Sequence, residues 1–272
     1  MLYSPILSFF RIFPLFFWTV ICLTLHTMFS LISRKNFFIF YKIFFKGLVK
    51  IFGIKVKQYG AKENKNIIYI SNHVSYLDVF VLGSMIDGIF VAKSEIDSWP
   101  LINKICALVK TIFIDRRDIL GIKKQMNSIL KSLKSGFNVI IFPEGTSSDG
   151  SRVLKFKSSL FGLVDLKTKE KFKIQPISIF YNKLDGMPVE RKFRPFFAWF
   201  GNMDLLPHAW KFLGLGLSEV KVNFHKAIEF SKFKNRKEAA NYCQKIISDQ
   251  VAINSQAMEV DSKIKLYEFK LL

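Results

Sequence analysis

The hydrophobic pattern begins with a continuous apolar segment near the start of the chain. Residues 12–32 read IFPLFFWTVICLTLHTMFSLI and contain no Lys, Arg, Asp or Glu. About 20 apolar residues are enough to cross a bilayer, so this segment predicts a membrane helix. The length of the apolar core and the lack of a following A-x-A site argue against a cleaved signal peptide. The pattern leaves open whether the helix crosses the bilayer or enters one leaflet.

The next segment, about residues 36–54, combines apolar residues with lysines at helical spacing. Lys42, Lys46 and Lys50 share one helical face, while phenylalanine, leucine and isoleucine occupy much of the remainder. This predicts an amphipathic helix in the interface of an anionic membrane; a core helix with a solvated lysine stripe is the alternative. Residues 1–55 are thus expected to be membrane-associating helices.

After Gly60, short β-rich runs alternate with helical patterns. The runs predict strands at 66–71, 88–93, 111–115, 138–142, 173–181 and 219–225. Helices are predicted at about 120–135, after Lys157 and at about 236–251. This alternation predicts an α/β domain, residues 56–272, with a mostly parallel or mixed sheet flanked by helices.

Composition and charge narrow the classes of protein. Half of the 272 residues are hydrophobic, which excludes a largely disordered chain. The net charge of +20 suits nucleic acid, an anionic membrane or an acidic partner, and the apolar start favours the membrane. Positive charge is heavier after the apolar segment than before it, which predicts a cytosolic globular part. The three cysteines are far apart, so neither a disulfide framework nor a zinc site is expected.

The stretch ISNHVSYLDVF, residues 70–80, carries the first candidate chemistry. His73 follows an apolar strand, and a helix is expected to begin near Ser75, with Asp78 in its first turn. Asp78 could then hold one ring nitrogen of His73 and leave the other as a base. By itself the stretch favours the simpler interpretation, a polar corner whose acid interacts with the helix dipole.

Three further stretches end predicted strands with groups that suit a ligand. IFIDRRDI presents Arg116, and GIFVAK presents Lys93; arginine binds phosphate in bidentate fashion, although a surface ion pair is a common alternative. VIIFPEGTSSDG presents Glu144, Gly145 and Thr146, where a simple turn is the alternative. Pro176 interrupts another strand, which indicates an edge position or bulge. His26, His208 and His225 are interpreted as structural.

Taken together, these stretches resemble the glycerolipid acyltransferase family of the 1-acylglycerol-3-phosphate acyltransferase type. The resemblance rests on four blocks in order: H-x4-D from His73 to Asp78, F-I-D-R ending at Arg116, F-P-E-G-T ending at Thr146, and a strand with Pro176. It covers about residues 60–230. It implies His73 as general base, Asp78 as its orienting acid, and an acceptor site with Lys93, Arg116, Glu144, Gly145 and Thr146.

Two positions depart from this family's pattern. Ser147 stands where the family commonly has arginine after E-G-T, and Arg152 is proposed as a substitute. Ile102 and Asn103 stand where a glycine often follows W-P-L. The runs EGTSSDGSRVLKFKSSLF and AWFGNMDLLPHAW look like the branch that includes lyso-ornithine-lipid acyltransferases.

The resemblance implies transfer of a fatty acyl group from acyl-CoA or acyl carrier protein to the hydroxyl of 1-acylglycerol-3-phosphate. Lyso-ornithine lipid is the alternative acceptor. No tightly bound cofactor, no metal and no nucleic acid are expected, and the implied location is the cytoplasmic (inner) membrane. The rival functions are a lipid hydrolase, although the G-x-S-x-G motif is missing at Gly145–Asp149, and a non-catalytic basic binding protein.

Overall fold

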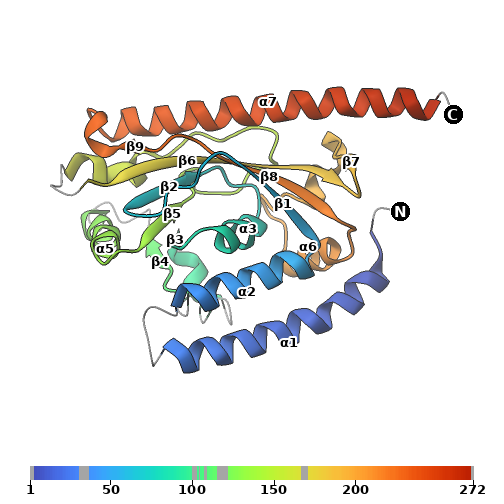
Figure 1. Cartoon of the computed structure of the whole chain (residues 1–272), viewed down its shortest axis with the longest axis horizontal. Helices are drawn as coiled ribbons and strands as arrows, with labels where there is room; N and C mark the ends of the chain where they lie inside the picture. The colour runs from blue at the N-terminus through green and yellow to red at the C-terminus, as the bar shows by residue number, and fades with distance from the viewer. Residues whose placement is uncertain are drawn as a thin grey trace.

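The computed structural model describes residues 3–30, 37–99, 103, 105–106, 109–114, 122–166 and 171–270. Its elements form layers around one sheet (Figure 1). Helix α7 (Arg236–Lys270) runs along one face of this sheet, and helix α3 (Leu77–Met85) lies on the other face. Helix α2 (Phe37–Ile51) packs on α3, and helix α1 (Pro5–Ser30) forms the outermost layer on that side.

The strands follow the order β1-β8-β6-β2-β5-β3-β4. Their bounds are β1 Ile54–Tyr59, β2 Ile67–Ser71, β3 Gly88–Lys93, β4 Ile112–Ile114, β5 Asn138–Ile141, β6 Lys173–Leu184 and β8 Ser218–Phe224. Strands β2 to β6 run parallel, whereas β8 is antiparallel to β6 and parallel to β1. Short strands β7 (Met187–Pro188) and β9 (Ile228–Glu229) pair antiparallel with β6. The prediction of a mixed sheet flanked by helices is confirmed.

The remaining described helices connect or cover these strands. They are α5 Ile122–Lys134, α6 Leu205–Leu213, and the 3-10 helices η2 Ser94–Ser98, η3 Ser158–Leu166, η4 Arg191–Phe196 and η5 Phe230–Lys232. Every residue of β2 and β5 is buried, because both faces of the central sheet are covered. This explains why these strands are continuous apolar runs rather than alternating ones.

Several predicted bounds differ from the structure for identifiable reasons. The helix expected to reach residue 54 ends at Ile51, because Gly53 turns with a φ of +66° and leads into β1, a strand that was not predicted. The segment after Lys157 is a 3-10 helix. Helix α7 continues well beyond residue 251, because Val251, Asn254 and Met258 extend its buried stripe.

Pro176 lies in β6 between β8 and β2, so the interpretation of an edge position is wrong. On one side, Pro176 pairs with Ile70 of β2. On the side of β6 that faces away from β2, the pairing strand changes along β6. Strand β9 pairs with residues 173–174, and β8 pairs from Ile177 onward. Proline has no N–H to donate, and it occupies the place where this change of partner leaves a gap in the ladder.

Helices α1 and α2 lie side by side beneath the domain (Figure 1). Arg11 Nη1 donates to the carbonyl oxygens of Leu213 (3.0 Å) and Leu215 (2.7 Å), and Trp18 Nε1 donates to the carbonyl of Phe44 (3.0 Å). The opposite side of α1 exposes its apolar residues, including Phe10, Phe16 and Phe17. The stretch Pro5–Leu25 is long and apolar enough to cross a membrane, by length and composition. The connection between the predicted helices, residues 31–36, lies outside the described residues.

Candidate active site

The predicted site segments meet at one edge of the sheet. Ile141 of β5 is in register with Ile70 of β2 and with Val91 of β3, and Lys93 of β3 is in register with Ile114 of β4. Because these strands are parallel, their carboxyl ends lie at the same edge, where α/β proteins commonly bind ligands. Arg116, which follows β4, lies outside the described residues.

His73 and Asp78 form a hydrogen-bonded pair at this edge. His73 Nδ1 lies 2.9 Å from Asp78 Oδ2, and the Asp78 side chain is fully buried while that of His73 is 19% exposed. With the first nitrogen engaged by the carboxylate, Nε2 is the nitrogen that can exchange a proton with a substrate. The pairing that the spacing allowed is therefore present in the structure.

The Asp78 carboxylate is held by several further donors. Oδ2 accepts hydrogen bonds from the backbone N–H groups of Val74 (2.7 Å) and Ser75 (2.9 Å), and Oδ1 accepts one from the Tyr181 hydroxyl (3.0 Å). The helix begins at Leu77, with Tyr76 as its N-cap, close to the start expected near Ser75. Asp78 is thus the second residue of α3 and binds the loop that carries His73. These contacts satisfy a buried carboxylate and fix the direction of its bond to the histidine.

The His73 ring is also fixed by stacking and by its own backbone. The ring stacks on Phe142, with centroids 4.2 Å apart and an interplanar angle of 21°. The carbonyl of His73 accepts a hydrogen bond from the Ser148 N–H at 2.9 Å. The segment from Phe142 to Ser148 therefore contributes both a ring and a backbone donor that hold the histidine in place.

Glu144 connects the same two segments. Its Oε1 accepts from the His73 N–H and its Oε2 accepts from the Leu154 N–H, each at 2.7 Å, and the residue is 3% exposed. Burial raises the pKa of Glu144 to about 8; the two N–H donors lower it, and the nearby Asp78 raises it. The carboxyl group thus ties the loop that carries His73 to the loop after β5. The contact of Glu144 with the acceptor stays a prediction.

The other proposed acceptor residues surround this edge. Gly145 adopts a φ of +79°, a left-handed conformation that suits glycine. Thr146 and Arg152 are exposed, and Lys93 is half-buried at the end of β3. The Ser147 hydroxyl, at the position where the resemblance expects arginine, donates to the carbonyl of Trp199. The roles assigned to these residues from the sequence stay predictions.

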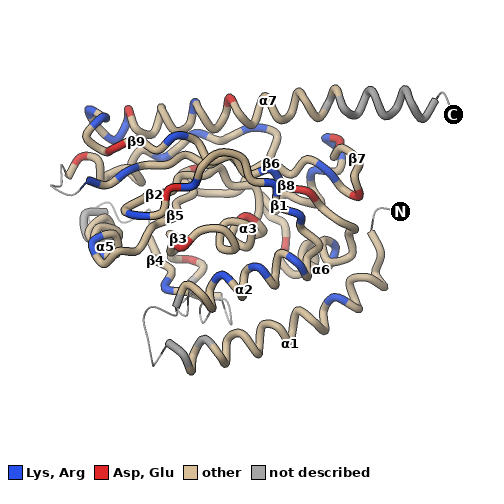
Figure 2. The backbone as a smooth tube through the Cα atoms, viewed as in Figure 1, with Lys and Arg blue, Asp and Glu red and all other residues tan. Residues whose placement is uncertain are grey.

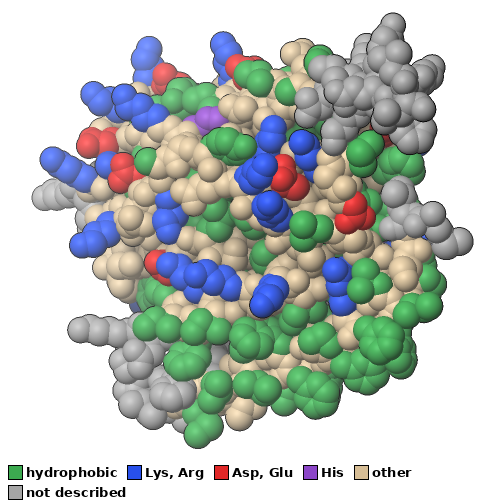
Figure 3. Space-filling view, turned by 45° about the vertical axis from the view of Figure 1, so that its right-hand side comes forward, with side chains coloured by type: hydrophobic (Ala, Val, Ile, Leu, Met, Phe, Trp, Pro, Cys, Tyr) green, Lys and Arg blue, Asp and Glu red, His purple; other side chains and the backbone are tan. Residues whose placement is uncertain are grey.

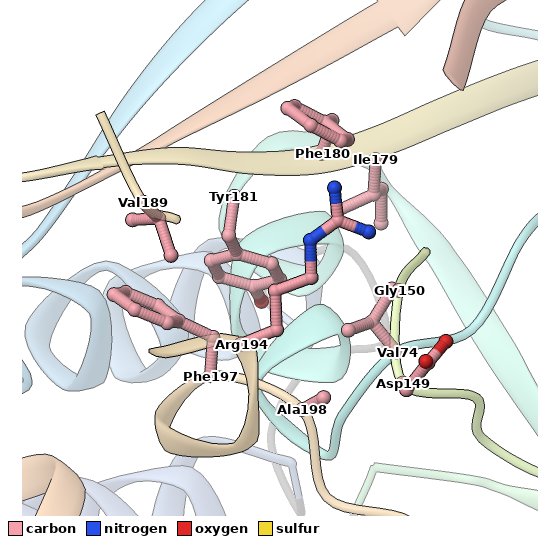
Figure 4. A pocket seen from close by; sticks show the side chains of 10 residues that line it. All are labelled: Val74, Asp149, Gly150, Ile179, Phe180, Tyr181, Val189, Arg194, Phe197 and Ala198. Atoms are coloured by element: carbon pink, nitrogen blue, oxygen red, sulfur yellow. The ribbon is translucent and has the colours of Figure 1, made fainter. Parts of the chain in front are cut away.

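A small cavity lies beside the His73–Asp78 pair, on the β6 side (Figure 4). Tyr181 and Val74 form part of its wall, and Arg194 of η4 extends across it. Arg194 Nη2 donates to Ser255 Oγ at 3.0 Å, and the guanidinium lies 5.8 Å from the Phe180 ring centroid. The contact with Ser255 joins η4 to α7.

The remaining described histidine side chains have internal partners. His208 Nδ1 lies 3.2 Å from the Tyr76 hydroxyl, and His225 Nε2 lies 2.6 Å from Ser178 Oγ. Burial lowers the pKa of both imidazoles, which favours their neutral forms. The side chain of His26 is outside the described side chains. Among the described residues, no cluster of three or more His, Cys, Asp or Glu side chains could hold a metal ion.

Comparison with known proteins places this geometry in a family. A family model described as Acyltransferase matches residues 53–194. A lyso-ornithine lipid O-acyltransferase of Rhizobium meliloti is 35% identical over 216 residues, covering 76% of this chain and 74% of the relative. A 1-acyl-sn-glycerol-3-phosphate acyltransferase of Neisseria gonorrhoeae is 29% identical over 173 residues, covering 63% and 64% of the two chains.

The fold has a solved counterpart. The crystal structure of the 1-acyl-sn-glycerophosphate acyltransferase PlsC from Thermotoga maritima matches 91% of this chain and 94% of its own, with a TM-score of 0.64 and 21% identity. The chain belongs to the acyltransferase family. It is an enzyme that transfers acyl groups, as the motifs predicted.

Two residues that hold the His73–Asp78 pair in place were not predicted from the sequence. Tyr181, which donates to Asp78, lies more than 100 residues away in β6, and only the alternation of that strand places it on the same face as Ile179. Ser148, which binds the His73 carbonyl, stood in a run interpreted as turn chemistry. Both contacts depend on tertiary structure and leave no local motif.

Proposed function

We propose that this enzyme transfers a fatty acyl group from a thioester to the free hydroxyl of a lysolipid. The observation that carries the proposal is the His73–Asp78 pair, with its buried carboxylate held by three other donors. His73 Nε2 takes the hydroxyl proton as the oxygen attacks the thioester carbonyl. The thiolate then leaves and receives that proton from the imidazolium, which Asp78 stabilises and orients. An ester and a free thiol are the products.

The acceptor head group is proposed to bind on the β3–β5 side of His73. Lys93 and Arg116 supply cations, and Gly145, Thr146 and the backbone beside Glu144 line the site. Arg152 supplies a further cation from the loop after β5. The donor is acyl-CoA or acyl carrier protein, and the strongly basic chain suits either acidic partner.

Specific observations support two acceptors. We propose lyso-ornithine lipid as the preferred one. The Rhizobium relative named for that acceptor covers three quarters of the chain. Ser147 puts a hydroxyl, bound to Trp199, where an arginine would suit a phosphate, and an ornithine head group carries no phosphate. The Neisseria relative and the predicted cations Lys93 and Arg116 support 1-acylglycerol-3-phosphate as the second candidate.

Helices α1 and α2 are proposed to hold residues 1–55 in the surface of the cytoplasmic membrane, with the acyltransferase domain, residues 56–272, facing the cytosol. Figure 3 shows hydrophobic side chains covering the lower part of the molecule and a row of Lys and Arg side chains above them. Phe10 and Phe16 of α1 are 64% and 62% exposed, respectively. Because Arg11 and Trp18 bind α1 along the domain, the helices fit one leaflet better than a perpendicular crossing.

Acceptor identity is tested with membranes that contain the enzyme, a labelled acyl donor and separate lysolipids. The acceptors are lyso-ornithine lipid, 1-acylglycerol-3-phosphate and glycerol-3-phosphate, and one sample has no acceptor. We expect the fastest ester formation with lyso-ornithine lipid and slower formation with 1-acylglycerol-3-phosphate. Membranes without the enzyme provide the background. Activity with none of the acceptors would contradict the proposal, and thioester hydrolysis without acceptor would favour a hydrolase.

A further inference from the structure

A second recess lies at the opposite edge of the sheet from His73. It has a volume of about 400 Å³ and opens beside the start of α2, near the amino ends of β3 and β5. Its lining includes Phe38, Ile39, Lys42, Asn64, Lys65 and Asp87. The catalytic pair is at the carboxyl ends of the same parallel strands, so this recess is a separate place on the molecule.

The recess has an apolar side and a firmly held polar side. Ile39, 56% exposed, and Phe38 belong to α2, next to the exposed apolar surface of α1. On the polar side, the buried Asn138 donates to the carbonyl oxygens of Asn64 (3.0 Å) and Asp87 (2.9 Å) and accepts from the Ile67 N–H (3.1 Å). These bonds fix the backbone that carries Lys65 and Asp87 at the edge of the apolar surface.

Positive charge exceeds negative charge around this recess. Lys42 Nζ lies 2.7 Å from each carboxylate oxygen of Asp87. Lys62 Nζ donates to the Met85 carbonyl at 2.7 Å, and Lys65 lines the recess itself. Figure 2 shows lysines recurring along α2.

The electrostatic environment of Lys62 shows how closely these cations are grouped. Burial lowers the pKa of the Lys62 ammonium most strongly, Lys42 and Lys46 lower it further, and Asp87 raises it. The nearby acid Glu63 is within 3.5 Å of Lys173. Repulsion among ammonium groups in one place is relieved when an anion binds between them.

We propose that this recess binds the phosphate group of an anionic membrane phospholipid, separately from the acyl acceptor. Lys42, Lys62 and Lys65 attract the phosphate oxygens, while Phe38 and Ile39 contact the glycerol and the first carbons of the chains. The apolar side indicates a lipid rather than free phosphate, since Ile39 is exposed on α2, and α2 packs on α1, which exposes apolar residues of its own. The inference rests on the membrane association in the proposed function and deepens it by naming a discrete lipid site.

The test compares full-length Lys62→Gln/Lys65→Gln with a matched control, Lys232→Gln/Lys234→Gln, at exposed lysines before α7. Purified proteins are diluted from detergent onto vesicles of phosphatidylcholine alone or with phosphatidylglycerol, and binding is measured by co-sedimentation. Near an anionic membrane each lysine contributes enough attraction that the Lys62/Lys65 variant should bind roughly tenfold more weakly to anionic vesicles. The control should remain near wild type, and all three proteins should bind phosphatidylcholine equally.

Three other results would overturn the proposal. Equal losses for the two double variants would overturn the discrete site, because they would reflect net charge alone. Displacement of the wild type from anionic vesicles by excess glycerol phosphate would overturn the lipid proposal and indicate a soluble phosphate ligand. No binding of the wild type to either vesicle would overturn the membrane association itself, and with it this inference.

Discussion

Two of the described histidines, His73 and His225, have surroundings that differ in ways that matter for chemistry. His73 follows β2, is paired with the carboxylate of Asp78 at 2.9 Å, and is 19% exposed at the ligand edge of the sheet. His225 follows β8 and lies 2.6 Å from Ser178 Oγ, but Ser178 is fully buried within β6. By distance alone, the second pair resembles a nucleophile and base.

The comparison shows that exposure and the type of partner decide which pair can react. A serine nucleophile must reach a substrate carbon, and the strands around Ser178 leave it no exposed surface. Burial lowers the pKa of His225 and favours its neutral form, whereas His73 has the carboxylate of Asp78 as its hydrogen-bond partner. The molecule therefore fits direct attack by an acceptor hydroxyl better than an acyl-enzyme on Ser178.

After the loss of His73 itself, the largest decrease in activity is expected from Asp78→Asn. The amide keeps the shape of the side chain but loses the charge that stabilises the imidazolium. We expect kcat to fall about 100- to 1,000-fold with a smaller change in KM. Initial rates in mixed micelles at several acceptor concentrations measure both constants. Circular dichroism of the variant checks that the fold is intact, and a kcat within about threefold of wild type would refute the orienting role.

A smaller loss is expected from Tyr181→Phe. This change removes the hydroxyl that donates to Asp78 Oδ1 but keeps the ring. A hydrogen bond to a charged group contributes about 1.5–3 kcal/mol, so kcat/KM should fall roughly tenfold or more. Tyr59→Phe, at an exposed tyrosine of β1, is the matched control. If both variants behave alike, Tyr181 does not position the catalytic acid.

Because of Glu144, the free energy of unfolding should depend on pH. Its pKa is raised from 4.5 to about 8, so the folded state binds the proton more tightly than the unfolded chain. Its contribution to stability is therefore fully present below about pH 4.5 and is lost as the pH rises toward 8. Denaturant unfolding in detergent at several pH values should show this decline in wild type and a weaker one in Glu144→Gln. If the unfolding free energies of the two proteins change with pH in parallel, Glu144 is not the group responsible for the decline.

The smallest effect is expected from Ser178→Ala. The change removes the hydroxyl beside His225 without creating a large cavity, and Ser178 touches no group proposed to contact substrate. Acyl transfer should stay within about threefold of wild type, because any effect arises only from the lost hydrogen bond. Rates are measured under the same conditions as for the Asp78 variant. A loss approaching that of Asp78→Asn would revive the serine hydrolase interpretation.

The sequence predicted those features that arise from local patterns. β2 and β5 were recognisable because buried parallel strands are short apolar runs, and the H-x4-D spacing correctly indicated that Asp78 can reach back to His73. Features that depend on distant partners were missed. Strand β1 pairs with β8 across some 160 residues, and Pro176 is tolerated only where β6 exchanges one partner for another.

The site likewise combines local contacts, which the sequence predicted, with contacts between distant segments, which it did not. The motifs predicted the His73–Asp78 contact, but the Tyr181 hydroxyl on the Asp78 carboxylate and the two backbone N–H groups held by Glu144 come from segments brought together in three dimensions. No local spacing indicates that Glu144 binds the histidine backbone. Residues 115–121, which include Arg116, lie outside the described residues, so the cation expected at the end of β4 stays a prediction.

The central claim is that His73 is the general base of acyl transfer, and it is tested most directly by comparing His73→Gln with His225→Gln. Both variants replace an imidazole with an amide, and both are assayed with one labelled acyl donor and the best lysolipid acceptor. General base catalysis contributes roughly 100- to 10,000-fold, so His73→Gln should lose activity by that factor while His225→Gln stays within about threefold of wild type. A His73→Gln enzyme that transfers acyl groups at a near-normal rate would contradict the account.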